Sequence, residues 1–459
     1  MAGDDPIVTI LDAPPKKTGT PPGPKGRLVL GHTFDYIRDP LTYLTRCARE
    51  HGDVVRLRLG DTTVFALFHP EHVDEILRAH GTRVIKDKMT RLINPIVGQG
   101  LLTSEGDFWR RQRKLTMPSF QHQAIERYGE VMVDYSVRMR DSWKVGEERD
   151  IHHDMMALTL GVVGKTLFDA EVTGESHEVG DALETVMDHF LSPWKWFPIL
   201  DRIPTKKNRA YKAAMRQIDE VVYTIIRRRR ASGNDPGDLL SRFLAVQDDE
   251  GAGMTDAQLR DECVTIFLAG HETTALVLTY AFRLLALHPE AEAALGLELD
   301  QVLGGRRPTA NDVARLKYTE WVVRESMRLY PPAWGIGREA TEPIEIGGYL
   351  APIGTQFSIT PWVMHRDPRW WDEPEAFRPE RWDHDLAKRL PKGAYIPFGG
   401  GPRVCIGNHF AMMEAVLLLA TLAQNHKLRL VPDQTLELAA SITLRPRGGT
   451  RVIVERRNG

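Results

Sequence analysis

The chain has few cysteines and no long apolar run, and each scarcity excludes a class of protein. Its 459 residues include only Cys47, Cys263 and Cys405, which are widely spaced and form no CxxC pair. A disulfide framework or structural zinc site is therefore not expected, and a reducing compartment is favoured. No stretch offers the roughly 18 apolar residues of a membrane span, and the N-terminus lacks the features of a signal peptide. We expect a soluble, cytoplasmic protein without a membrane span.

Charge of either sign is not in excess. Charged side chains make up 27% of the chain, and the formal net charge is −2. This balance gives no electrostatic signal for binding nucleic acid or an anionic membrane. Hydrophobic residues contribute 42%, which is enough to bury a sizeable core. An ordinary globular protein with no nucleic-acid partner is expected.

Patterning along the chain predicts a mainly α fold (α+β) with small sheets. Residues 1–26 are rich in proline and glycine, which favours an extended leader. Residues 53–68 alternate around a Gly-Asp turn, as in a β-hairpin. Helical patterning dominates over 107–300, and strand-like runs return at 344–359 and 438–455. We predict that residues 27–459 form one domain, with a small β subdomain built from the three strand segments.

One predicted helix is long and has polar residues at its centre. Residues 255–258 (TDAQ) have the form of a capping box, and apolar patterning then continues to His288, where Pro289 follows. This predicts a helix of about 33 residues, roughly 50 Å long. Residues 270–274 (GHETT) interrupt its apolar flanks, where an unpaired Glu272 would carry a heavy desolvation cost. Glu272 therefore needs a polar partner or a wet cavity.

The most specific stretch is FGGGPRVCIG at residues 398–407. Its three glycines allow the backbone to turn tightly against a flat group. Cys405 comes just before a helix-like segment, whose N-terminus would stabilise a thiolate. A thiolate in that position suits a soft or borderline metal. An ordinary buried cysteine is the alternative for a lone Cys, but the ten-residue context argues against it.

This stretch resembles the cysteine loop of the cytochrome P450 family of haem-thiolate monooxygenases, and similar motifs follow over nearly the whole chain. The resemblance implies a triangular, mainly helical fold with haem b (iron protoporphyrin IX) between the long helix and the helix after Cys405. Cys405 would then be the axial iron ligand, Phe398 would pack against its sulfur, and Arg403 would reach a haem propionate. In such enzymes the thiolate pushes electron density onto iron and favours O–O cleavage.

The motif WRRQR places Trp109 and Arg113 four residues apart on one helical face. The resemblance implies that both hydrogen-bond a propionate, for which an indole N–H and a guanidinium are suited. A solvated basic helix with one core tryptophan is the alternative for this motif alone. Arg110, Arg111 and Lys114 lie beside it, and we expect them to help dock an acidic electron donor.

The segment AGHETT begins at Ala269 and resembles the family's oxygen-activation segment. The small Ala269 would leave room above the iron for O₂. Thr273 lies on the same face, where a hydroxyl bonded to the i−4 carbonyl can open a helix locally. The resemblance implies that Glu272 and Thr273 relay protons, with a polar kink without chemistry as the alternative. His271 is expected to be packed or solvated rather than a ligand.

Two further segments resemble parts of the substrate channel. PPAWGIGR ends at Arg338, which would lie near a propionate, while Ala333 and Trp334 would face the substrate. The bulky Trp334 would narrow the pocket near iron, with packing in the core as the alternative. Residues 188–205 resemble a mobile lid, with a simple packed loop as the alternative.

Glu325 and Arg328 resemble the family's structural acid–base pair, three residues apart on one helix, and Arg381 looks like its third member. A Glu with two Arg partners makes a bidentate network that can survive burial. We assign this trio to support of the fold rather than to catalysis.

The sequence is therefore identified as that of a haem-dependent monooxygenase. It would insert one atom of O₂ into a C–H bond or alkene of a hydrophobic small molecule: a fatty acid, terpenoid, steroid-like compound or polyketide. The chain carries no flavin domain, iron–sulfur cysteine pattern or dinucleotide fingerprint, so electrons would come from a separate ferredoxin or flavodoxin with its reductase. A peroxide-driven peroxygenase or a haem-thiolate isomerase or dehydratase is the alternative, and a non-catalytic haem sensor is disfavoured. We expect a monomer.

Overall fold

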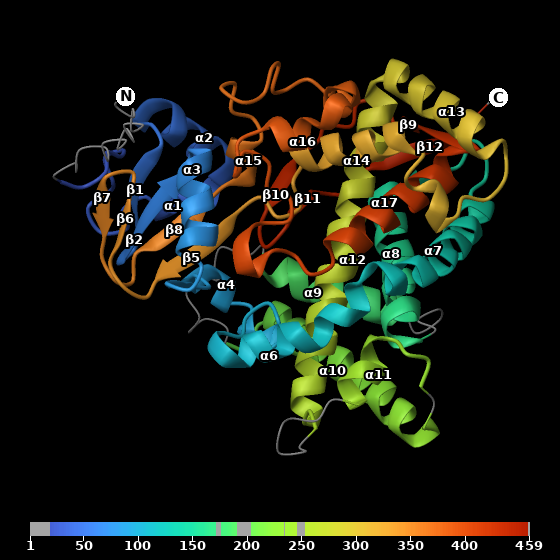
Figure 1. The fold of residues 1–459 in the computed structure, drawn as a ribbon, viewed down its shortest axis with the longest axis horizontal. Helices are drawn as coiled ribbons and strands as arrows, with labels where there is room; N and C mark the ends of the chain where they lie inside the picture. The colour runs from blue at the N-terminus through green and yellow to red at the C-terminus, as the bar shows by residue number, and fades with distance from the viewer. Residues whose placement is uncertain (1–18, 171–175, 191–202, 234, 246–252, 458–459) are drawn as a thin grey trace, which may run out of the picture.

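The computed structural model describes residues 19–170, 176–190, 203–233, 235–245 and 253–457. Most of the predicted leader lies outside these residues, and residues 19–26 form neither helix nor strand. Helices make up most of the described chain, and the strands form small sheets beside them (Figure 1). The predicted mainly helical fold with small sheets is confirmed.

The described chain contains α-helices from end to end. They are α1 (Thr33–Arg38), α2 (Pro40–His51), α3 (Pro70–Asp74), α4 (Lys88–Arg91), α5 (Asn94–Val97), α6 (Gly106–Thr116), α7 (His122–Ser142), α8 (Ile151–Phe168), α9 (Ser176–Phe190), α10 (Lys206–Ser232), α11 (Leu239–Ala245), α12 (Asp256–Leu287), α13 (Pro289–Leu303), α14 (Lys317–Leu329), α15 (Pro361–Met364), α16 (Leu386–Arg389) and α17 (Asn408–Ala423).

The strands form one five-stranded sheet and three smaller ones. They are β1 (Val54–Leu59), β2 (Thr62–Leu67), β3 (Val84–Ile85), β4 (Glu148–Asp150), β5 (Ile336–Ala340), β6 (Ile344–Ile346), β7 (Tyr349–Ala351), β8 (Gln356–Ile359), β9 (His426–Leu430), β10 (Leu438–Ala440), β11 (Leu444–Pro446) and β12 (Arg451–Arg456).

The five-stranded sheet has the order β1-β2-β8-β5-β3 and lies on the N-terminal side of the molecule (Figure 1). Its β1–β2 hairpin pairs Val54 with Leu67 and turns at Gly60, whose φ is +60°, as the alternation of this segment predicted. Strand β8 adds to β2 in parallel, with Phe65 opposite Phe357. The sheet thereby brings β5, from the last third of the chain, against the N-terminal strand β3.

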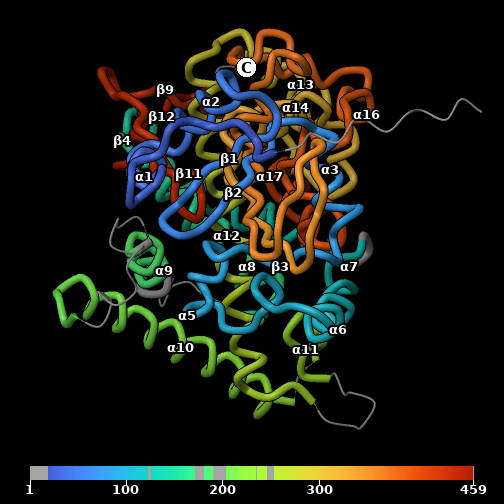
Figure 2. The backbone as a smooth tube through the Cα atoms, turned by 90° about the vertical axis from the view of Figure 1, so that its left-hand side faces the viewer, coloured from blue at the N-terminus to red at the C-terminus, as the bar shows by residue number. Residues whose placement is uncertain are grey.

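Helix α12 is the central element of the helical part (Figure 1). It has 32 residues, and Thr255 and Gln258 form the predicted capping box at its start. Helices α8, α10, α14 and α17 pack against it, which explains why its flanks are apolar all round. Among the described residues it is the one helix long and apolar enough to cross a membrane, yet 78% of its most apolar window is buried inside the protein. Figure 2 shows α9 and α10 along the edge of this bundle.

The trio of Glu325, Arg328 and Arg381 forms a closed network between α14 and the segment Pro379–Asp385. The Glu325 carboxylate accepts Nη2 of Arg328 at 2.8 Å and Nε of Arg381 at 2.9 Å on the same oxygen. Its other oxygen accepts Nε of Arg328 and the indole N–H of Trp382, both at 2.9 Å. Glu325 and Arg328 are completely buried. The predicted structural role of the trio is therefore supported by its geometry, since each charge has partners.

Replacing Glu325 by Gln tests this network. The substitution keeps the shape but leaves Arg328 as a buried charge without its counterion, which costs about 3–5 kcal/mol of unfolding free energy. Glu320→Gln is the matched control, because Glu320 pairs with Arg324 on the same helix but is partly exposed; its loss should stay below about 1 kcal/mol. Urea unfolding measures both, and equal losses would contradict the assignment.

Candidate active site

The midpoint of α12 exposes two small side chains although its flanks are buried. Ala269 is exposed and Thr273 is partly exposed, one turn apart on the same face. The Thr273 hydroxyl donates to the Ala269 carbonyl at 2.8 Å, the i−4 bond expected from the sequence. On another side, a Cβ at Gly270 would come within 3.0 Å of Val163 on α8. The Ala269 face therefore borders open space while the Gly270 face is packed.

The loop before α17 presents Cys405. Gly399 and Gly401 have φ of +71° and +66°, which favour glycine, and the Cys405 amide donates to the Phe398 carbonyl at 3.0 Å. The Cys405 side chain is exposed to the space beside the loop, but protein atoms surround it on the other sides. Burial raises the pKa of the Cys405 thiol, while the Gly407 amide and Arg113 act to lower it. The sulfur thus has a small set of groups that favour the thiolate.

Phe398 lies at the start of this loop and is partly buried. Its ring packs against the main hydrophobic core, which surrounds α12 and α17. Phe398 and Cys405 are joined by the backbone hydrogen bond described above, so the ring and the sulfur belong to one tight turn.

The cationic residues predicted to hold a propionate gather close to Trp109. The Arg403 guanidinium lies 4.0 Å from the centre of the Trp109 ring and that of Arg113 lies 5.8 Å from it. Arg403 also donates to the Ser104 carbonyl at 2.8 Å and pairs with Glu105. Its Nη1 is buried and has no hydrogen-bond partner among the described residues.

Arg338, which is buried, and Lys86, which is partly buried, add two more cations to this group. Arg338 on β5 is only 5% exposed, and the described residues offer its guanidinium one hydrogen bond, to the Gly337 carbonyl. Burial, and then repulsion from Arg403, lowers its pKa to about 10. Burial, and then Arg338 and Arg403, lowers the pKa of Lys86 to about 7. Buried like charges of this kind fit an anionic ligand that would neutralise them, as the two propionates of a haem would.

Sequence reasoning missed Lys86. It stands in an ordinary-looking stretch, RVIKDK, and no local pattern separates it from a solvated lysine. Only the fold brings it to the arginines, because β3 pairs with β5 and so carries residue 86 towards Arg338.

Glu272 is turned away from the exposed face of α12. It is 2% exposed, and its Oε1 accepts Nε of Arg445 at 2.6 Å and the Thr443 hydroxyl at 2.5 Å. Burial acts to raise the pKa of Glu272, but Arg445 and Thr443 outweigh it, so the pKa lies below its ordinary value. The expectation that Glu272 needs a partner is confirmed, although no sequence pattern pointed to Arg445.

Two other sequence expectations are resolved by packing. His271 is 1% exposed and its Nδ1 lies 2.5 Å from the Phe267 carbonyl, so it is a packed histidine, as expected. Trp334 does not narrow a pocket: it is 7% exposed, belongs to a core cluster with residues of α2 and β1, and donates to the Ser441 carbonyl at 2.7 Å. The core-packing alternative is correct because the indole N–H finds its partner there. Of the predicted lid, 191–202 lie outside the described residues.

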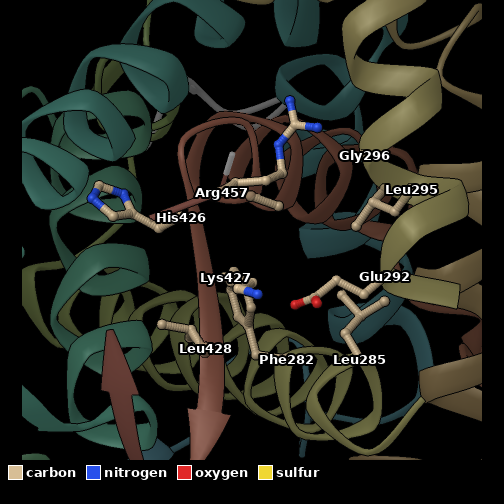
Figure 3. Close-up of a pocket in the computed structure, with 10 residues that line it drawn as sticks. Phe282, Leu285, Glu292, Leu295, Gly296, His426, Lys427, Leu428 and Arg457 are labelled. Carbon is tan, nitrogen blue, oxygen red and sulfur yellow. The ribbon is translucent and has the colours of Figure 1, made fainter. Parts of the chain in front are cut away.

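A separate pocket lies near the C-terminal end of α12, between α13 and β9. Phe282, Leu285 and Leu295 form part of its lining. Figure 3 shows the Glu292 carboxylate facing Lys427 across it. Burial raises the pKa of Glu292, and Lys427 acts to lower it. This pocket lies more than two turns of α12 beyond Thr273 and contains none of the predicted site residues.

The chain matches the family model "Cytochrome P450" over residues 21–450 and therefore belongs to the cytochrome P450 family. It is a monooxygenase of that family, an oxidoreductase that incorporates oxygen, with the family's haem-thiolate cofactor and a hydrophobic substrate. It is 38% identical to "Cyclooctatin synthase" and 37% identical to "Cyclooctat-9-en-7-ol 5-monooxygenase", both from Streptomyces melanosporofaciens. The first match covers 95% of each chain, and the second covers 92% of this chain and 93% of the relative. It is also 32% identical to "Pentalenene oxygenase" of Streptomyces avermitilis, over 93% of this chain and 94% of the relative.

Another buried carboxyl, that of Glu414, lies on α17 and was also missed. It is completely buried, and the Thr274 hydroxyl of α12 is near its carboxyl group but outside the geometry of a good hydrogen bond. Burial raises its pKa to about 8, and the Thr274 hydroxyl only partly offsets this. Its position nine residues after Cys405, on an apolar helix, could have marked it as a buried acid.

Glu414 predicts a specific dependence of stability on pH. Because its folded pKa of about 8 exceeds the unfolded value, the folded state keeps a proton that the unfolded state loses. Between roughly pH 4.5 and 8 this group lowers the unfolding free energy as pH rises, by up to about 1.4 kcal/mol per pH unit. Glu414→Gln should lessen the slope by this contribution and leave that of Glu262, whose pKa burial also raises to about 8, whereas Glu290→Gln, at an exposed position of α13, should leave the slope unchanged. Urea unfolding at several pH values measures it, and an unchanged slope in Glu414→Gln would contradict the raised pKa.

Proposed function

We propose that Ala269, Thr273 and Cys405 face one space between α12 and α17, which takes haem b. The observation that carries this proposal is the group of buried and partly buried cations near Cys405. Arg338 has no ion pair among the described residues, and a buried nitrogen of Arg403 lacks a hydrogen bond. A flat group with an iron for the sulfur and two carboxylates for the arginines meets both needs.

The residues around this space take different parts in holding the cofactor. Cys405 would be the axial ligand, with Phe398 against the sulfur. Trp109 and Arg113 from α6 and Arg403 from the loop would bind propionates, because indole and guanidinium N–H groups donate to carboxylates. Arg338 from β5 would do the same from the sheet side, and Lys86 stands beside it.

The reaction consumes one C–H bond or alkene, one O₂, two electrons and two protons, and yields one oxygenated product and one water. When bound, the thiolate-ligated haem supplies the oxygen activation. Ala269 keeps the space beside α12 free for O₂, since its side chain is a single methyl. The Thr273 hydroxyl, held on the Ala269 carbonyl, and the Glu272 carboxylate would deliver protons. This pair favours O₂ over a peroxide-driven reaction.

For the substrate we propose a hydrophobic terpenoid. The relatives named for cyclooctat-9-en-7-ol and pentalenene support this choice among the hydrophobic classes expected from the sequence. Addition of a terpene hydrocarbon should shift the Soret band by displacing water from the iron. A response to fatty acids but to no terpenoid would contradict the choice.

We propose that electrons come from a ferredoxin or flavodoxin with its reductase. Arg110 and Lys114 are exposed on α6, next to the residues that would bind propionates, and Arg111 is partly buried between them. A basic surface there would steer an acidic donor, so reduction should slow as ionic strength rises. Reduction rates indifferent both to salt and to Arg111→Glu would contradict this docking site.

We further propose that residues 27–459 act as one domain and that the protein is a cytoplasmic monomer.

The ligand assignment is tested by the spectrum of the reduced carbon monoxide complex. A cysteine thiolate gives this complex a strongly red-shifted Soret band, and we expect that band in the protein as expressed. Cys405→Ser should lose it while Cys47→Ser, a buried cysteine of α2, should keep it. A red-shifted band in Cys405→Ser would overturn the assignment.

Proton delivery is tested by Thr273→Ala. Loss of a positioned proton donor should lower the rate of product formation on the order of 10²-fold and send electrons to hydrogen peroxide instead. Thr279→Ala is the matched control, because Thr279 also donates to its i−4 carbonyl, at 2.7 Å, but is completely buried. Product and peroxide per electron pair are measured together, and a peroxide yield equal to that of the control would contradict the role of Thr273.

A further inference from the structure

The carboxylate of Glu272 is held by two residues from the C-terminal strands. Arg445 lies in β11 and Thr443 just precedes it, and both hydrogen bonds end on the same oxygen, Oε1. The Arg445 side chain is 7% exposed and that of Glu272 is 2% exposed, so the ion pair is removed from water. A carboxylate held in this way stays charged, because its protonation would leave the guanidinium buried without a counterion.

Arg445 has a second carboxylate within reach. Its Nη1 lies 3.6 Å from Oδ1 of Asp188 on α9, and the Asp188 side chain is 55% exposed. Its Nη2 is buried and has no hydrogen-bond partner among the described residues. The guanidinium of Arg445 is therefore bound closely by the buried Glu272 and loosely by the exposed Asp188. Its Nη2 could donate a further hydrogen bond.

The other ionisable groups around the pair do not replace either partner. On α8, burial and then Arg445 lower the pKa of His152 to about 4, so it is neutral at neutral pH. Burial also lowers the pKa of His271 on α12. Glu184 on α9 adds negative charge on the outer side of Arg445, as Asp188 does, and Asp150 acts on His152.

Glu272 and Thr273 point in different directions from α12. Successive residues of an α-helix are about 100° apart, and Thr273 lies on the Ala269 face while Glu272 faces β11. Paired with Arg445, Glu272 neither accepts a proton readily nor lies on the side where Thr273 stands. A part in proton delivery therefore requires that Glu272 leave Arg445.

We propose that Arg445 is a positioning residue, which keeps Glu272 charged and turned away from Thr273 and releases it when the guanidinium moves to Asp188. The inference rests on the proposed function, in which Glu272 and Thr273 deliver protons. In this proposal the exposed Asp188 on α9 influences the position and protonation of the buried Glu272, because both carboxylates bind Arg445.

The protonation of Glu272 gives a readout that does not depend on activity. Infrared difference spectra between each haem-loaded protein and the same protein carrying Glu272→Gln isolate the carboxylic-acid band of Glu272. At neutral pH we expect no such band in the wild type or in Arg445→Lys, which keeps the positive charge. Arg445→Gln should show the band, because burial alone raises the pKa of this carboxyl. An ionised Glu272 in Arg445→Gln would overturn the proposal.

The outer partner is tested by Asp188→Asn, a substitution at an exposed position. Arg445 would then stay on Glu272, so the hydrogen peroxide formed per electron pair should rise roughly two- to fivefold, the range that an exposed ion pair supplies. Asp181→Asn is the matched control, because Asp181 is exposed on the same helix two turns earlier. Equal peroxide yields in the two variants would overturn the proposal even where Arg445→Gln does not fold.

The carbon monoxide spectrum separates this inference from the proposed function. A wild-type spectrum without the thiolate band would defeat the proposed function itself. A normal thiolate band together with an ionised Glu272 in Arg445→Gln, or with unchanged peroxide yield in Asp188→Asn, would defeat only the role of Arg445.

Discussion

A sulfur that must carry negative charge inside the protein is the interaction on which the rest of the structure depends. Burial raises the pKa of the Cys405 thiol and so works against the thiolate that an iron ligand requires. Two groups act to lower the pKa of this thiol: the Gly407 amide, just before α17, and the positive charge of Arg113 on α6. The Gly407 amide belongs to the same loop as Cys405, whereas the charge of Arg113 comes from a separate helix, so both the loop and α6 support the thiolate.

The same electrostatic problem recurs elsewhere in the interior, and the chain meets it in different ways. Glu325 is neutralised by two arginines, and Glu272 by one. The group of Arg338, Arg403 and Lys86 is incomplete, since a buried nitrogen of Arg403 has no hydrogen-bond partner among the described residues. Burial first, and repulsion from neighbouring arginines after it, lower the pKa values of these three residues. Closed networks of the first kind stabilise the fold, whereas incomplete ones mark the places where a ligand or a proton belongs.

Local patterns were sufficient to predict much of this structure. The hairpin at β1–β2, the length and cap of α12 and the i−4 bond of Thr273 each depend on residues close together in sequence. The partners that could not be predicted are distant ones: Arg445 reaches Glu272 across 173 positions, and Lys86 meets Arg338 through strand pairing. Trp334 was ambiguous for the same reason, since its position next to a functional segment did not reveal the Ser441 carbonyl that holds its N–H in the core. Whether such a side chain lines a pocket or packs in the core depends on its burial, and burial is a property of the whole fold.

The cysteine loop also fits tightly against a segment more than three hundred residues earlier. A Cβ at Gly401 would come within 1.7 Å of the Leu77 carbonyl oxygen, and one at Gly81 within 2.9 Å of Pro402. Leu77 belongs to a π-helical turn, Glu75–Ala79, whose widened backbone places that carbonyl against the loop. The ten-residue motif therefore depends on the segment against which it packs. A scaffold that received this loop would also have to receive residues 75–81, because their backbone fits the positions where the loop has glycine.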